Sequence, residues 1–307
     1  MSKSNSTNYK LTGKELIESA FEIVGIDSAG EPLEAEEEQS ALRVLNTMLK
    51  ALQRKLNIWK RKTLTINLVS GQTVYTIGQK SAGTITSFTT LQLNDGSADF
   101  VKDDVQVGDT VYNTTDNTSE AVLTVSTANQ LTFASELFSV ALEDYEITSA
   151  DISAPRPLKI LECNRKDTTG NEVPVTPMTR NEYEALSNKT TAGAPLNYHY
   201  DPTLDNGTFY IWQSPNATIV STWTLELVYQ SPIEDIDNVN DSVDVPAENL
   251  EALVINLGYR LSNHGFGGIG ATDKRTLRQD AKDALDDASG YDQESGSVYC
   301  VPELREG

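Results

Sequence analysis

Apolar side chains between Glu34 and Lys62 recur at steps of three and four residues, the spacing of one narrow helical face. Glutamates crowd the start of this segment, and lysines and arginines crowd its end, as the helix dipole favours. The pattern predicts a single helix of about 25 residues, a rod of about 37 Å at roughly 1.5 Å per residue. Such a rod needs a partner helix. The apolar positions are Leu42, Leu45, Leu49, Leu52, Leu56 and Trp59.

A shorter helical pattern precedes the rod and two others lie near the C-terminus. Thr12 and Glu15 have the spacing of a capping box, and Gly25 is expected to end the first helix. The first helix and the rod therefore predict a helical hairpin. Amphipathic spacing predicts the two later helices at residues 246–262 and 272–289.

The period changes to two after the rod, which is typical of β-strands. Two runs around the Gly71 turn, residues 64–69 and 74–77, predict a β-hairpin. After Pro155 we expect two strands and a short helix capped by Thr179, followed by a three-strand meander. The strands of this part are expected at 156–163, 172–175, 197–201, 208–212 and 222–229.

Residues 78–150 differ in texture from both flanks. Short β-forming runs alternate with turn residues, and eleven Asp and Glu stand against two lysines. We expect an inserted small all-β domain here. The expected fold class is α+β: a helical bundle core, made of residues 1–77 and 151–290, with an antiparallel β element. Residues 291–307 are expected to form a polar C-terminal tail.

Composition adds limits to this picture. The chain has 307 residues, 38% of them hydrophobic, and a formal net charge of −21. That charge disfavours wrapping nucleic acid, which needs clustered Lys and Arg. No apolar run approaches the roughly 20 residues of a membrane span, and the polar first residues predict no signal peptide. Cys163 and Cys300 stand far apart and are expected to be reduced thiols.

Candidate catalytic chemistry is sparse in the sequence. The two histidines, His199 and His264, lack Cys or carboxylate partners at metal-ligand spacing. The glycine-rich stretch 265–270 lacks the preceding strand of a dinucleotide site, so we interpret it as a hinge. We expect no enzyme activity, no cofactor and no metal. A pair of carboxylates that cleaves glycosides stays open as an alternative, because Asp and Glu are plentiful.

The order of several linked pieces carries a family resemblance that no single motif would. They are the helical hairpin, LNIWKRKTLTINLVSGQTVYTI (Leu56–Ile77), RPLKIL (Arg156–Leu161), TRNEYEALSNKTTAGAPLNYHYDP (Thr179–Pro202), FYIWQSP (Phe209–Pro215), YQSP (Tyr229–Pro232), VPAENLEALVINLGYRLS (Val245–Ser262) and the final helix. Together they resemble the head-to-tail adaptor family of short-tailed bacteriophages, the head-completion or packaged-DNA-stabilising proteins. The resemblance covers Thr12–Ile77 and Pro155–Ser289, and it leaves the insert at 78–150 unexplained.

The resemblance implies a structural virion protein at the head-tail junction. It implies a dodecameric ring between the portal protein and the tail nozzle protein, which retains packaged double-stranded DNA and lets it pass on ejection. An acidic channel wall would repel DNA and prevent sticking. The resemblance also implies that the last helix and the tail bind the portal. The portal-binding candidates are Thr272, Leu277, Leu285, Tyr291, Tyr299, Val301 and Leu304.

A basic cluster at the end of the rod is the one patch expected to approach DNA or a neighbouring subunit. Its simpler interpretation is a solvated face that complements the helix dipole, or a salt bridge to an acidic neighbour. Its members are Arg54, Lys55, Lys60, Arg61 and Lys62.

Two further function classes remain open at this stage. One is a phage enzyme that degrades the peptidoglycan of the cell wall. The other is a glycan-binding tail module, in which Tyr112, Phe133 and Tyr145 of the insert stack on sugar, although aromatic residues at alternate positions are more often core. The alternative role for the insert is structural: it would project outward and brace the tail or the tail fibres.

Overall fold

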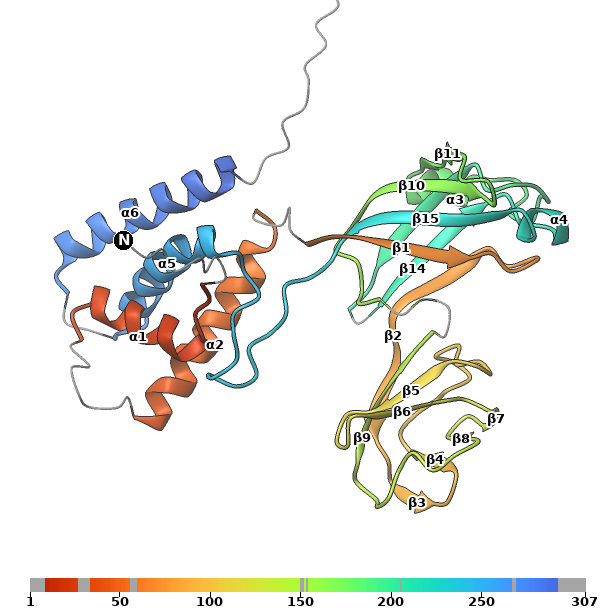
Figure 1. The fold of residues 1–307 in the computed structure, drawn as a ribbon, viewed down its shortest axis with the longest axis horizontal. Helices are drawn as coiled ribbons and strands as arrows, with labels where there is room; N and C mark the ends of the chain where they lie inside the picture. Colours follow the sequence, from red (N-terminus) through yellow and green to blue (C-terminus); the bar gives the residue numbers. More distant parts are fainter. Residues whose placement is uncertain are drawn as a thin grey trace, which may run out of the picture. The chain divides into compact units, whose positions relative to one another are not determined.

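The computed structural model describes residues 9–26, 34–55, 60–149, 152, 154–204, 206–266 and 269–291. The chain forms two compact units, drawn in Figure 1. The helical unit comprises residues 1–59 and 233–307, so it combines an N-terminal and a C-terminal segment of the chain. The β unit comprises residues 60–232.

Four α-helices build the helical unit around one core. They are α1 (Gly13–Ile23), α2 (Ala35–Leu52), α5 (Leu250–Asn263), which follows the 3-10 turn η2 (Ala247–Asn249), and α6 (Ala271–Tyr291). Helix α5 lies at the centre and packs against the other three. Its predicted inner face is confirmed, since Leu250, Leu253, Leu257 and Leu261 are buried in the core cluster and Val254 packs against it, partly buried.

Local signals placed the starts of two helices correctly. The Thr12 side chain accepts a hydrogen bond from the Glu15 amide at 3.2 Å, and the Thr12 amide donates to the Glu15 carboxylate at 2.8 Å. Thr179 and Glu182 form the same capping box at α3 (Arg180–Glu184) of the β unit. Each box satisfies backbone donors that a helix start leaves without partners.

The predicted rod from Glu34 to Lys62 is wrong in its length. Helix α2 ends at Leu52, and the chain is already extended at Arg61, where strand β1 (Arg61–Asn67) begins. The reason is non-local. Strand β1 pairs residue by residue with strand β15 (Trp223–Gln230), from Arg61 opposite Gln230 to Asn67 opposite Thr224. Leu56 and Trp59 lie outside the described residues.

Two sheets of the β unit face one another across a shared apolar core. The first has the order β1-β15-β10-β11, with β10 at Lys159–Asp167 and β11 at Glu172–Pro174. The second has the order β12-β13-β14-β2-β9-β5-β6. Its first four strands are Thr176–Pro177, Asn197–Pro202, Asn206–Trp212 and Val74–Thr84. The core between them includes Ile66, Leu225 and Leu227 from the first sheet and Tyr75, Ile77, Phe209 and Ile211 from the second.

The part of the β unit between residues 85 and 147 has a core of its own, centred on Phe100, Leu131 and Tyr145. Its strands are β3 (Ser87–Thr89), β4 (Gln92–Asn94), β5 (Thr110–Asn113), β6 (Thr118–Ala121), β7 (Thr124–Thr127), β8 (Gln130–Thr132) and β9 (Asp144–Thr148). Strand β2 continues into it and pairs with β9 after Gly78, whose φ of 104° favours glycine. That residues 78–150 form an inserted domain remains a prediction.

The expected fold class, a helical bundle core with a small β element, is wrong. Fifteen strands in three sheets stand against six α-helices among the described residues, two of them, α3 and α4 (Ala217–Val220), only short turns of the β unit. The strands were expected to form a small element beside the helices, but they form a separate unit with two apolar cores. The period of a strand identifies its apolar face but not the element that covers this face. The strands were therefore expected to pack against the helices, whereas they pack against one another.

Two expected strand pairings are also wrong. Strands β1 and β2 do not form a hairpin, because they belong to different sheets. The predicted three-strand meander is also incomplete. Strands β13 and β14 pair with each other, but β15 pairs with β1 and β10 in the other sheet. None of the helices within the described ranges is long and apolar enough to cross a membrane.

Candidate functional site

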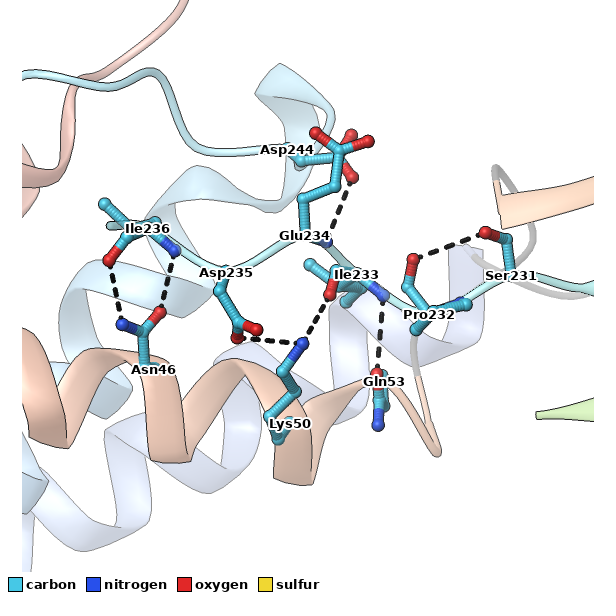
Figure 2. A network of polar contacts seen from close by, with 10 residues as sticks. All are labelled: Asn46, Lys50, Gln53, Ser231, Pro232, Ile233, Glu234, Asp235, Ile236 and Asp244. Carbon is cyan, nitrogen blue, oxygen red and sulfur yellow. Dashed lines mark hydrogen bonds and ion pairs between the residues drawn. The ribbon is translucent and has the colours of Figure 1, made fainter. Parts of the chain in front are cut away.

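The segment that re-enters the helical unit after Pro232 lies along helix α2 (Figure 2). Asn46 holds it with two hydrogen bonds to the backbone of Ile236. Its amide nitrogen donates to the Ile236 carbonyl at 2.9 Å, and its amide oxygen accepts from the Ile236 amide at 3.0 Å. One side chain on the helix thus supplies the two bonds that a neighbouring strand would supply.

Lys50 and Gln53 continue this contact toward the end of α2 (Figure 2). The Lys50 ammonium donates to the Ile233 carbonyl at 2.7 Å and pairs with the Asp235 carboxylate at 2.8 Å. Gln53 accepts from the Ile233 amide at 3.3 Å. Both partners of the ion pair are about half exposed, so its net contribution to stability is small, about 0–1 kcal/mol.

The same segment then caps the start of helix α1. The Gly13 amide donates to the Asp241 carbonyl at 2.9 Å, and the Val243 amide donates to the Leu11 carbonyl at 3.1 Å. Ile236 and Val243 are buried in the helical core. Residues 233–243 are therefore an integral layer of the helical unit. The polar face of α2 that carries Asn46 and Lys50 is already occupied.

We expect Asn46 to contribute to the stability of the helical unit more than an exposed polar residue of the same segment does. We expect Asn46→Ala to lower the free energy of unfolding of the helical unit by about 1–3 kcal/mol, because both Ile236 backbone groups lose their partner in a half-buried site. Urea denaturation followed by circular dichroism at 222 nm measures this. Asn240→Ala is the matched control, since the exposed Asn240 side chain bonds to Asn238 alone among the described residues, and it should change stability by less than about 0.5 kcal/mol. Equal effects of the two substitutions would contradict the role given to Asn46.

A basic hollow of about 220 Å³ lies between helices α2 and α5. Arg43 and Arg260 are its charged walls, and no carboxylate lines it. Within the described part of the chain, neither guanidinium has a hydrogen-bond or ion-pair partner. We call this feature the basic hollow. Its lining residues are Ser40, Arg43, Val44, Thr47, Arg260 and His264.

An acidic groove of about 490 Å³ lies between the N-terminal end of α5 and helix α6. Three α6 carboxylates, Asp280, Asp283 and Asp287, line one wall, and Glu248 and Glu251 line the other. Alanines form the apolar part of the lining, and no Lys or Arg contributes to it. All five acidic residues are exposed. We call this feature the acidic groove.

The structure places the predicted portal-binding residues in different environments. Thr272 is exposed in the first turn of α6. Leu277 is buried, 9% exposed, and Leu285 packs against the helical core, so both hold α6 in place. Nothing is described of the Tyr291 side chain. Tyr299, Val301 and Leu304 lie outside the described residues.

The predicted basic patch is not one continuous helical face. Arg54 and Lys55 are exposed just after α2, in the helical unit. Arg61 and Lys62 are exposed at the start of β1, in the β unit. Lys60 is only 3% exposed, and its carbonyl accepts from the Ser231 amide at 2.8 Å. Sequence reasoning missed Arg43 and Arg260, whose proximity depends on the packing of α2 against α5.

The two histidines considered for catalysis belong to different units. His199 stacks on Tyr183 and Tyr210 in the β unit, with ring centres 6.3 and 5.8 Å away. His264 ends α5 and lines the basic hollow. Burial raises the pKa of the Cys163 thiol to about 12, which keeps it protonated and weakly nucleophilic. No group of three or more His, Cys, Asp or Glu in the described ranges is arranged to hold a metal ion.

Two buried carboxylates organise residues 85–147. Asp95 accepts from the Ser97 hydroxyl at 2.6 Å and from the Tyr145 hydroxyl at 2.8 Å. Glu143 accepts from the Ser139 hydroxyl at 2.7 Å and from the Asn113 amide group at 3.1 Å. Burial raises the pKa of each group, but the hydrogen bonds outweigh it, so both pKa values lie below their ordinary 3.8 and 4.5.

These shifts predict acid sensitivity of the β unit. A carboxylate whose pKa is lower in the folded chain contributes stability above its ordinary pKa and loses it as the pH falls through the folded pKa. We expect the urea midpoint of the β unit to fall steeply below about pH 4. Glu143→Gln should lower the midpoint at pH 7 and flatten this pH dependence. The same slope in the variant and the parent chain would rule out Glu143 as its source.

No family model matches the chain, and a search of curated proteins finds no match.

Proposed function

We propose that this protein is a head-to-tail adaptor of a short-tailed bacteriophage. In this proposal, copies of the chain form a dodecameric ring between the portal protein and the tail nozzle. The ring retains packaged double-stranded DNA, forms the channel for its ejection and resides in the virion. The chain acts as a structural component without catalysis, and it contacts no membrane.

The observation that carries this proposal is the order of linked pieces along the chain. Each piece corresponds to a defined element: the Thr12-capped α1 and α2, strands β1 and β2, strand β10, the Thr179-capped α3, strands β13 to β15, and helices α5 and α6. Segments that are distant in sequence, residues 9–55 and 233–291, meet in one helical unit. An adaptor subunit needs such a preformed body, because it must present fixed faces to several partners at once.

The acidic character of the chain also fits the proposed channel. With a net charge of −21, exposed carboxylates greatly outnumber cations, and a wall of like charge does not hold DNA that must move past it. Portal docking is proposed for the exposed first turn of α6, for the end of this helix and for the residues that follow it. Thr272, Tyr291, Tyr299, Val301 and Leu304 remain its candidates, whereas buried Leu277 and half-buried Leu285 support the helix from within. Residues 78–150 are proposed to brace the tail fibres.

The decisive experiment is assembly with the portal protein from the same genome. Native mass spectrometry and electron microscopy of the full chain, alone and mixed with that portal protein, should reveal a ring bound to the portal. A chain that ignores the portal at micromolar concentrations would overturn the proposal and return attention to wall degradation and glycan binding. Deletion of residues 80–149 should leave the ring intact and remove fibre attachment.

A further inference from the structure

The basic hollow is an unusual feature in so acidic a chain. The chain has 24 Lys and Arg against 45 Asp and Glu, yet two of its arginines face one hollow without a carboxylate from the same copy. Ser40 and Thr47 add hydroxyl groups, and His264 adds an imidazole. Guanidinium groups bind carboxylates through paired hydrogen bonds. The hollow therefore fits a ligand that carries several carboxylates.

The acidic groove carries carboxylates at a spacing that suits this hollow. Asp280, Asp283 and Asp287 follow one another at steps of three and four residues, so they share one face of α6. The first and last are about 10 Å apart along the helix axis at roughly 1.5 Å per residue. Among the described residues Asp283 accepts a bond only from Gln279, and the other four carboxylates of the groove have no partner.

The two surfaces belong to one compact unit and share no residue. Helix α5 contributes to both: Glu251 and Ala252 near its start line the groove, and Arg260 and His264 at its end line the hollow. Ala252 and Arg260 are about 12 Å apart along the axis. One copy can therefore offer its hollow and its groove at the same time. Two different complementary faces on one subunit produce a head-to-tail contact, which closes into a ring when the rotation allows.

We propose that the basic hollow of one copy receives the acidic α6 face of a second copy, and that this contact joins neighbouring subunits. Arg43 and Arg260 pair with Asp280, Asp283 or Asp287 across the interface. This inference rests on the proposed ring and names its lateral contact. It names a second copy rather than DNA as the occupant, because every copy supplies an exposed acidic face without Lys or Arg that is complementary to the two arginines of the hollow.

Charge reversal on either side tests the contact. Arg43→Glu/Arg260→Glu places like charges opposite the groove, and Asp280→Lys/Asp283→Lys places them opposite the hollow. Each variant alone should need at least about a tenfold higher concentration for half-assembly, because juxtaposed like charges oppose association. Sedimentation velocity and native mass spectrometry, with and without the portal protein, measure this. Assembly of the parent chain should also weaken with added salt.

Mixing the two variants provides the sharpest outcome. The reversed hollow then meets the reversed groove, and the parent hollow meets the parent groove, so alternating copies should regain assembly. The single chain that carries all four substitutions should also assemble. Recovery in either form excludes misfolding as the cause of the loss. Lys102→Glu/Lys159→Glu is the matched control for the hollow variant, because it makes the same change in net charge at exposed lysines of the β unit, and it should assemble like the parent.

The outcomes separate this inference from the function on which it rests. If the parent chain forms rings and both reversed variants do so equally well, the lateral contact is wrong and the adaptor proposal stands. If the reversed hollow keeps its rings but loses affinity for double-stranded DNA, DNA is the occupant and the inference is overturned. If the parent chain never self-associates, alone or with the portal, both proposals fall.

Discussion

Asp109→Ala should destabilise the β unit by about 3–5 kcal/mol, because it leaves a buried ammonium without its counter-charge. The Lys80 ammonium lies 2.8 Å from the Asp109 carboxylate, and the two side chains are only 6% and 5% exposed. Lys80 also donates to the Asp104 carbonyl at 2.9 Å, and Asp109 accepts from the Gln106 amide at 2.7 Å. The pair therefore fixes the chain at 104–109 against strand β2.

The measurement is urea denaturation monitored by tryptophan fluorescence. A double variant, Lys80→Met/Asp109→Leu, should lose much less than Asp109→Ala, since replacing both buried charges by apolar groups is often nearly neutral. Asp201→Ala is the exposed control, because its partner Arg180 is 68% exposed, and it should cost less than about 1 kcal/mol. A cost below about 1 kcal/mol for Asp109→Ala would mean that water solvates the Lys80 ammonium.

Leu257→Ala should lower the stability of the helical unit by about 2–5 kcal/mol and leave the β unit unchanged. Leu257 is fully buried where α5 packs among the other helices, so truncation leaves a cavity in a core that joins all four. The β unit has separate cores, so its own contacts remain. The urea midpoint of the circular dichroism signal at 222 nm should therefore move to a lower urea concentration. The urea midpoint of the fluorescence signal should stay unchanged.

A Trp59→Phe background makes this distinction clean, because Trp212 and Trp223 then report on strands β14 and β15 alone. Phe209→Ala is the reciprocal variant, since Phe209 is fully buried between the two facing sheets. It should move the fluorescence midpoint and spare the helical signal. If both signals move together in both variants, the two units unfold as one cooperative structure.

The candidate surfaces show why site prediction from this sequence was incomplete. The basic residues after α2 were predicted as one patch because they lie within nine positions of one another in the sequence, yet Lys60 is buried. Arg43 and Arg260 are more than two hundred residues apart and become neighbours only because α2 and α5 pack together. The acidic groove likewise combines the start of α5 with the second half of α6. A sequence records the charges but not which of them face one another.

The sequence by itself determined the local features of this protein. The capping boxes at Thr12 and Thr179, the inner face of α5 and the amphipathic α6 each depend on side chains within a few turns of one helix. Tertiary structure decided the rest: the end of α2 at Leu52, the pairing of β1 with β15, and the position of residues 233–243 on α2. The physical reason is sequence distance: caps and helical faces need only neighbouring residues, whereas the pairing of β1 with β15 and the contact of residues 233–243 with α2 join segments more than a hundred residues apart.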